Sequence, residues 1–110
     1  MKKMFILLLI LAMVAGVVFA QTLKDGSYTT RGGGYLGDIT VRVTVSEGRM
    51  TNIEVVEHQD TPMWVADVVR DLIPRLIQEQ RFNVDATSGA TGTSEGIKQA
   101  VRLALVQARS

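Results

Sequence analysis

The clearest pattern in the sequence is an alternation of apolar and polar residues along one short segment. Its apolar members are Ile39, Val41, Val43 and Val45. A period of two predicts a β-strand with one buried side and one solvent-facing side. A β-prone run over 27–31 predicts a preceding strand, and the three glycines at 32–34 are expected to form a flexible turn.

A second turn and a returning strand are predicted after this segment. Glu47-Gly48 is typical of a tight turn, and residues 50–58 continue with apolar positions on one side. Met50 is out of phase with the inward positions that follow it, so a bulge is expected near Thr51-Asn52.

Beyond these strands the apolar spacing changes to three and four residues. Two segments, 65–77 and about 94–107, show this period, which predicts two amphipathic helices. Thr61 and Pro62 suit a cap and a first turn, whereas Pro74 is expected to kink or split the first helix. The predicted fold class is therefore α+β: a small antiparallel sheet of about three to four strands with both helices packed on one face.

The first 20 residues have the layout of a secretory signal peptide. Lys2 and Lys3 precede an apolar run that ends at Val18-Phe19-Ala20. An uncleaved membrane anchor is the alternative, because about 17 apolar residues are the lower limit for crossing a bilayer. We therefore predict a signal peptide over 1–20 and a domain over 21–110 on the periplasmic or extracellular face of a bacterial membrane.

The net charge changes sign when the leader is excluded. The chain has 12 basic and 11 acidic residues, and two of the lysines lie in the leader, so 10 − 11 gives −1 for the domain. This balance argues against a nucleic-acid partner. The chain has no Cys and one His, His58, so neither thiol chemistry nor a metal site is predicted. Reactivity is expected from hydroxyls, carboxylates, glycines or a cofactor.

Small and polar residues fill the segment 83–94 between the two predicted helices. One interpretation is a polar loop in which Thr93 or Ser94 caps the following helix. The other is an anion site, because glycines allow close backbone approach and free amides at a helix start attract phosphate. The Walker and dinucleotide-binding patterns are both absent.

The same segment contains the motif Asp85-x-x-Ser88-Gly89-Ala90-Thr91. It resembles the flavinylation motif of the FMN-binding domain family, which includes the covalent-flavin subunits of sodium-pumping NADH:quinone reductases and of Rnf electron-transport complexes. In that family the last Thr carries FMN through a phosphoester bond, installed by a flavin transferase that uses FAD and a divalent metal such as Mg²⁺. The likeness covers essentially all of residues 23–108.

The resemblance implies that Thr91 is the covalent attachment site for FMN. It also implies that Ser88, Gly89 and Ala90 form the turn that presents this residue. Asp85 is implied to be recognised by the transferase, or to stabilise the turn as an Asx-type cap.

Further cofactor-binding residues are implied on either side of the flavin. The phosphodiester is expected near Thr93 and Ser94, and the facing loop contains His58, Thr61 and Pro62. The family often has Gly after this Thr-Pro pair, whereas this chain has the bulkier Met63-Trp64. These residues are expected to cover the flavin, shift its reduction potential or narrow access to it.

Structural rather than functional roles are expected for several other residues. Trp64 is predicted to lie in the core, with stacking on a flavin as the alternative, and His58 is predicted to be structural rather than a proton donor. Tyr28 and Tyr35 are expected as sheet or loop-edge residues, with a role in shaping the pocket as the alternative. A solvated helix surface is predicted for Asp67, Arg70, Asp71 and Arg75.

These observations favour an exported one-domain flavoprotein that carries electrons on FMN bound to Thr91. Flavin supplies the redox chemistry in such a domain, and the protein supplies binding and orientation. Its expected partners are the flavin transferase and redox proteins or a quinone-linked membrane complex. Two alternatives are a small flavin-dependent reductase of a small acceptor and a non-redox ligand-binding module.

Overall fold

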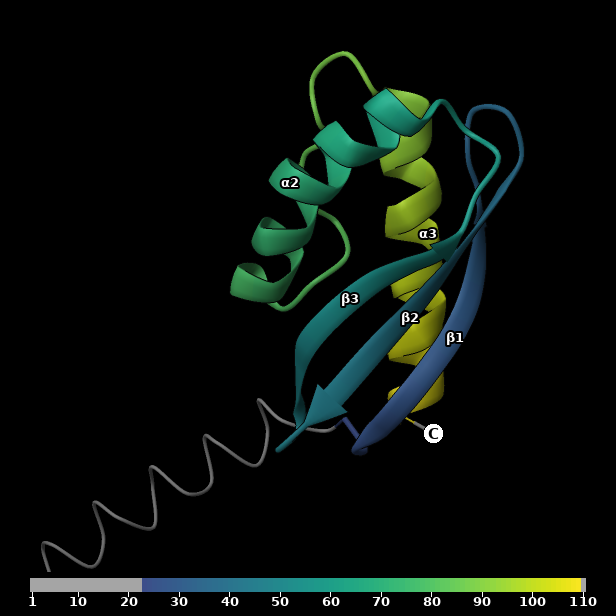
Figure 1. Cartoon of the computed structure of the whole chain (residues 1–110). Helices are drawn as coiled ribbons and strands as arrows, with labels where there is room; N and C mark the ends of the chain where they lie inside the picture. Colours follow the sequence, from purple (N-terminus) through teal and green to yellow (C-terminus); the bar gives the residue numbers. More distant parts are fainter. Residues whose placement is uncertain (1–22, 110) are drawn as a thin grey trace, which may run out of the picture.

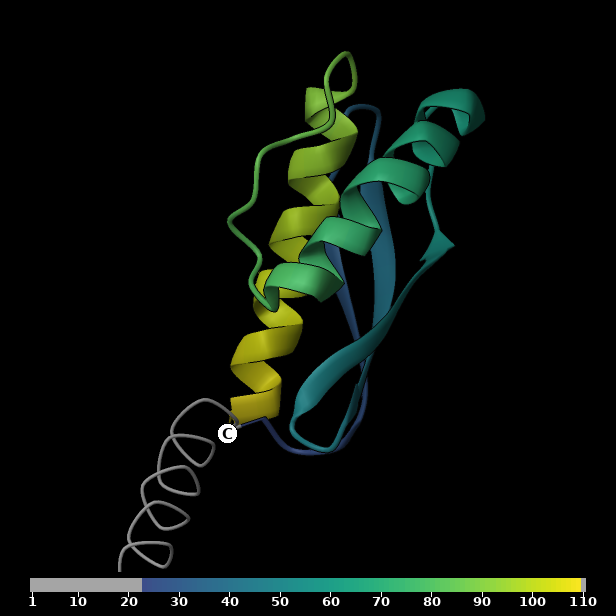
Figure 2. The same cartoon turned by 90° about the vertical axis from the view of Figure 1, so that its left-hand side faces the viewer.

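A three-stranded antiparallel sheet carries two helices on one face (Figures 1 and 2). The computed structural model describes residues 23–109, and the predicted signal peptide over 1–20 lies outside them. The elements in chain order are β1 (Gly26–Gly33), β2 (Asp38–Ser46), β3 (Arg49–Glu57), α2 (Pro62–Glu79) and α3 (Thr91–Arg109). The α+β prediction is confirmed. No helix within the described part of the chain has the length and apolarity needed to cross a membrane.

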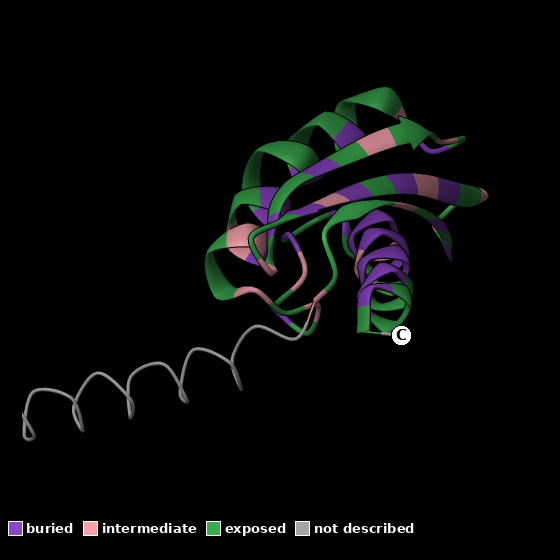
Figure 3. Cartoon of the chain, turned by 90° about the horizontal axis from the view of Figure 1, so that it is seen from below, coloured by how far each residue is buried: buried purple, intermediate pink, exposed green. Residues whose placement is uncertain are grey.

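One core lies between the sheet and the helices. The four predicted inward residues of the central strand are at most 3% exposed: Ile39, Val41, Val43 and Val45. Figure 3 shows buried and exposed residues alternating along the strands, as a period of two requires. The helix α3 lies against β1 and β2, and α2 packs beside it toward β3.

The predicted bulge is present in β3. Thr51 is an extra residue opposite the step from Thr44 to Val45 of β2. The extra residue restores the phase of the strand, so that Met50 and Ile53 are both buried.

The helix α2 continues through Pro74, so the prediction that this residue splits the helix is wrong. A proline inside a helix costs about 3 kcal/mol. Its neighbours Leu72, Ile73 and Leu76 are buried in the core, and each such burial contributes about 1.5–3 kcal/mol. Packing of the apolar face therefore outweighs the missing backbone hydrogen bond.

The glycine run packs a strand against a helix, so the prediction of a flexible turn is wrong for Gly32 and Gly33, which belong to β1. A Cβ on Gly32 would lie 1.8 Å from the carbonyl oxygen of Gly96 in α3. A Cβ on Gly96 would in turn lie 2.9 Å from the Cα of Gly34. Close approach of two backbones, rather than a turn, requires glycine at both Gly32 and Gly96.

Candidate functional site

The helix α3 begins three residues earlier than predicted. Its first residue is Thr91, and the amide of Ser94 donates to the carbonyl of Ala90 at 3.0 Å. Thr93 and Ser94 therefore lie within the first turn, and the prediction that either one caps the helix is wrong. The hydroxyl of Ser94 instead accepts from the amide of Thr87 at 3.0 Å and donates to the Ala90 carbonyl at 2.7 Å.

A tight turn precedes Thr91. The amide of Ala90 donates to the carbonyl of Thr87 at 3.1 Å, and Gly89 between them has a φ of 83°. A positive φ at the third position of a β-turn favours glycine. A Cβ on Gly89 would meet nothing within 4 Å, so backbone conformation rather than crowding explains this residue. The turn leaves Ser88, Gly89 and Thr91 exposed.

A pocket of about 310 Å³ opens at this end of α3. Its lining combines two aromatic rings with the start of the helix: Tyr35, Trp64, Gly89, Ala90, Thr91, Gly92 and Thr93. The rings of Tyr35 and Trp64 meet edge to face, with centroids 6.1 Å apart. This volume is at the lower end of the range for small-molecule sites.

Trp64 lies on the pocket wall, so its predicted place in the core is wrong. It is 39% exposed and belongs to the first turn of α2, and Val65 and Val68 of the same helix take the core-facing positions. Tyr35, at a loop edge as expected, is 65% exposed. One wall of the pocket is therefore aromatic and partly open to solvent.

Asp60 is a site residue that the sequence interpretation missed. It is 3% exposed, and its carboxylate accepts from the amides of Tyr35 and Leu36 at 3.0 and 2.7 Å. The hydroxyl of Thr93 donates to the same carboxylate at 2.5 Å. One side chain thus joins the β1–β2 loop to the first turn of α3, and its only sequence signal is its place directly before Thr61.

The pKa of Asp60 lies below its ordinary value of 3.8. Burial raises this pKa, but the hydrogen bonds from Thr93, Leu36 and Tyr35 and the nearby charge of His58 together outweigh burial. The Nδ1 atom of His58 is buried and has no hydrogen-bond partner among residues 23–109.

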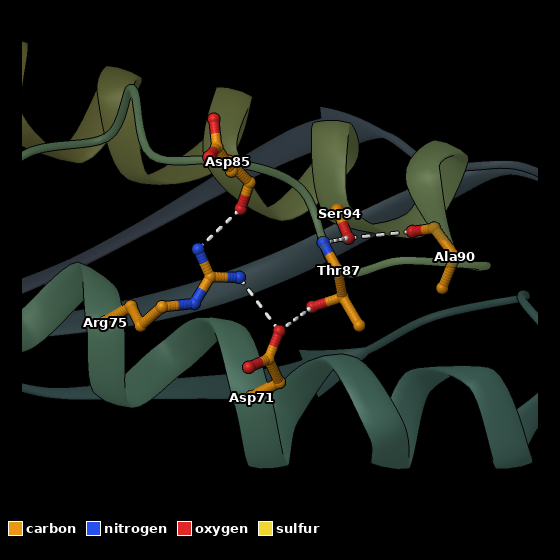
Figure 4. Close-up of polar contacts among 6 residues, drawn as sticks. All are labelled: Asp71, Arg75, Asp85, Thr87, Ala90 and Ser94. Carbon is orange, nitrogen blue, oxygen red and sulfur yellow. Dashed lines mark hydrogen bonds and ion pairs between the residues drawn. The ribbon is translucent and has the colours of Figure 1, made fainter.

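The motif segment is tied to α2 by two charged side chains (Figure 4). The carboxylate of Asp71 accepts from the hydroxyl of Thr87 at 2.8 Å and from Arg75 Nη2 at 2.8 Å. The Nη1 atom of Arg75 donates to the carbonyl of Asp85 at 2.8 Å. These hydrogen bonds from Thr87 and Arg75 lower the pKa of Asp71 below 3.8.

Asp71 lies on the solvated helix surface as predicted and Arg75 is half-buried, but both side chains also bind the motif segment, which the sequence did not indicate. The prediction of a solvated helix surface is correct for Asp67 and Arg70, which pair with each other at 3.5 Å in solvent. The two pairs look alike in sequence, and they differ because the chain after α2 returns alongside only one of them.

The remaining predicted site residues lie outside the pocket lining. Thr61 precedes α2 without a side-chain cap, and Pro62 is the first helical residue. The carboxylate of Asp85 makes no hydrogen bond among residues 23–109, so the Asx-cap interpretation is not observed. The structure brings Gly89, Ala90, Thr91 and Thr93 to the pocket.

Acid is expected to destabilise this site. Asp60 and Asp71 have pKa values that are lower in the folded protein than in the unfolded chain, so their stabilisation is present above about pH 4 and is lost as pH falls through the folded pKa values. We expect the free energy of unfolding, measured with urea, to fall as the pH is lowered below about 4. Asp60→Asn should make that decline shallower; an unchanged slope in this variant would contradict the assignment.

The fold is a small α+β domain whose pocket sets two aromatic residues against a helix start. The FMN-binding domain family matches residues 34–106, and the chain belongs to this family. FMN is thus the cofactor that the family indicates.

Two relatives in which the matched segment is part of a longer protein are similar to this chain. An uncharacterized protein of Treponema pallidum (strain Nichols) is 36% identical over 85 residues, which cover 77% of this chain and 24% of the relative. A protein of Vibrio harveyi named NADH:acrylate oxidoreductase is 38% identical over 86 residues, covering 74% of this chain and 8% of the relative. The chain spans a quarter or less of each.

Proposed function

We propose that this domain carries electrons on an FMN held by a phosphoester bond to Thr91. The observation that carries the proposal is the exposed side chain of Thr91 on the pocket wall, at the first position of a 19-residue helix. The first amides of a helix have no partner within it, and the helix dipole favours negative charge there. Both features suit a phosphate group next to this hydroxyl.

The aromatic wall suits the ring of the same cofactor. Tyr35 and Trp64 offer flat apolar surfaces, and aromatic rings favour contacts with other rings. Because Trp64 and Tyr35 are 39% and 65% exposed, the rim of the pocket is open to solvent on its aromatic side. An open rim supports electron exchange with a partner that docks over the pocket.

A carrier role is favoured over a self-sufficient reductase. The relative named as an oxidoreductase is a much larger protein of which this chain matches 8%, which supports one electron-transfer module among several. The proposed partners are redox proteins or a quinone-linked membrane complex, with a flavin transferase for maturation. The leader-like residues 1–20 support a place on the periplasmic or extracellular face of the membrane.

Incubation with a flavin transferase, FAD and Mg²⁺ tests the attachment. Trypsin cuts after Arg81 and Lys98, so Thr91 lies in the peptide 82–98. We expect this peptide to gain the mass of FMN less one water, and the intact protein to turn yellow. An unchanged peptide, under conditions that load an established acceptor domain in parallel, would overturn the proposal.

A further inference from the structure

We propose that Asp71 and Arg75 of α2 position the motif segment for flavin transfer, so that the transferase meets a turn that is already formed. This inference rests on the proposed function. Neither residue lines the pocket, and both act through the segment that precedes Thr91. We call the pair, with its contacts to Asp85 and Thr87, the α2 clamp.

Thr87 is hydrogen-bonded to both helices. It is 8% exposed, its amide donates to Ser94 of α3 at 3.0 Å, and its hydroxyl donates to Asp71 of α2 at 2.8 Å. Its carbonyl accepts from Ala90 and closes the turn. Holding Thr87 from both sides therefore fixes the start of the turn that directly precedes Thr91.

Arg75 supplies a second point of attachment. Its guanidinium donates through Nη2 to Asp71 and through Nη1 to the carbonyl of Asp85, both at 2.8 Å. A planar guanidinium that bridges two acceptors sets their relative orientation. With its carbonyl directed toward α2, Asp85 keeps its carboxylate exposed, and Figure 4 shows this side chain pointing away from Arg75.

Two exposed groups of the motif lie on the segment that the clamp holds: the carboxylate of Asp85, which has no hydrogen-bond partner among residues 23–109, and the hydroxyl of Thr91. In the transfer, the Thr91 oxygen bonds to the phosphorus of the FMN half of FAD, the phosphoanhydride bond breaks, and AMP leaves. The hydroxyl proton passes to a base of the transferase. An acceptor segment that is already ordered loses less conformational entropy when the transferase binds it. The clamp should therefore act mainly on the binding of this domain by the transferase.

The test compares Asp71→Ala with Asp67→Ala as a matched control. Both changes remove a carboxylate paired with an arginine on the same helix, but within residues 23–109 the carboxylate of Asp67 pairs with Arg70 and makes no hydrogen bond to the motif segment. With purified transferase, we expect Asp71→Ala to raise the KM for the acceptor chain by about 3- to 10-fold, with kcat nearly unchanged. Asp67→Ala should match the wild type.

A double-mutant cycle separates the clamp from a general loss of structure. Thr87→Val removes the hydroxyl that donates to Asp71, so it should raise KM to a similar extent. The double variant should then be little worse than either single one, because both changes remove the same contact. Fully additive effects would contradict the clamp.

Hydrogen exchange in the flavin-free chain gives a readout that does not depend on loading. Asp71→Ala should speed exchange of the Thr87 and Ala90 amides by about 3- to 10-fold, whereas Asp67→Ala should not. Unchanged exchange overturns the clamp. If the wild type is loaded and Asp71→Ala is loaded with the same KM, the clamp fails and the proposed function stands. A wild type that takes no flavin overturns the proposed function together with the clamp's role in transfer.

Discussion

Replacing Thr91 with alanine is expected to abolish covalent FMN while leaving the domain folded. The side chain of Thr91 is exposed, and its hydroxyl makes no hydrogen bond with the rest of residues 23–109. Alanine is also the better helix former, so the free energy of unfolding should change by no more than about 0.5 kcal/mol. Loss of the adduct would then reflect loss of the attachment atom alone.

Three variants sharpen this experiment. Ser88→Ala removes another exposed hydroxyl from the same tryptic peptide and should leave the adduct in place. Thr91→Ser keeps an oxygen at the attachment position and should still be loaded. Thr93→Ala should also be loaded, although it loses the hydrogen bond to Asp60 and should be less stable. Intact-protein mass spectrometry after incubation with transferase and FAD distinguishes these outcomes.

An adduct of undiminished yield on Thr91→Ala would contradict the assignment of the attachment site. Fragmentation of the peptide 82–98 would then show which other hydroxyl carries the flavin. The candidates in that peptide are Thr87, Ser88, Thr93 and Ser94. Of these only Ser88 is exposed, because the other three are buried.

The sheet and the helices were predictable because burial on one face leaves a period in the sequence. The alternation through Val41 and Val43 located β2, and the phase change at Met50 located the bulge of β3. Pro74 was misjudged because a local penalty was considered without the core that the same helix buries. A period shows which face of an element is covered, but it does not show which segment covers it.

In the candidate site, too, contacts between sequence neighbours were predictable and contacts between distant segments were not. The turn before Thr91 was predictable, because its glycine and its hydroxyls are neighbours in the sequence. Asp60 and Asp71 were missed because they act on residues that are distant in the chain: Asp60 bonds to Tyr35 and Asp71 to Thr87. Trp64 was misplaced for the same reason. It lines the pocket because Tyr35 of the distant β1–β2 loop lies against it, and the sequence around Trp64 does not show this contact.

The contact between β1 and α3 should be the most sensitive point of the fold. Gly32→Ala would place a Cβ 1.8 Å from the carbonyl oxygen of Gly96, well inside the distance that two such atoms tolerate. The obstruction is backbone, so no side chain can move aside, and the strand and the helix have to separate. We expect a loss of about 3 kcal/mol or more in the free energy of unfolding, measured with urea. A domain of this size has roughly 5–10 kcal/mol in total.

Gly33→Ala is the matched control for this prediction. Gly33 is the next residue of the same strand, and an added Cβ there would meet only the side-chain oxygen of Gln99 at 3.8 Å, an ordinary contact. Neither glycine has a positive φ, so the two substitutions differ in crowding and not in backbone strain. Gly33→Ala should change stability by no more than about 0.5 kcal/mol. Equal stability of the two variants would show that β1 and α3 do not approach this closely.

Because Gly96 lies only five residues after Thr91, a displaced helix in Gly32→Ala should also slow flavin loading, whereas Gly33→Ala should be loaded at the wild-type rate.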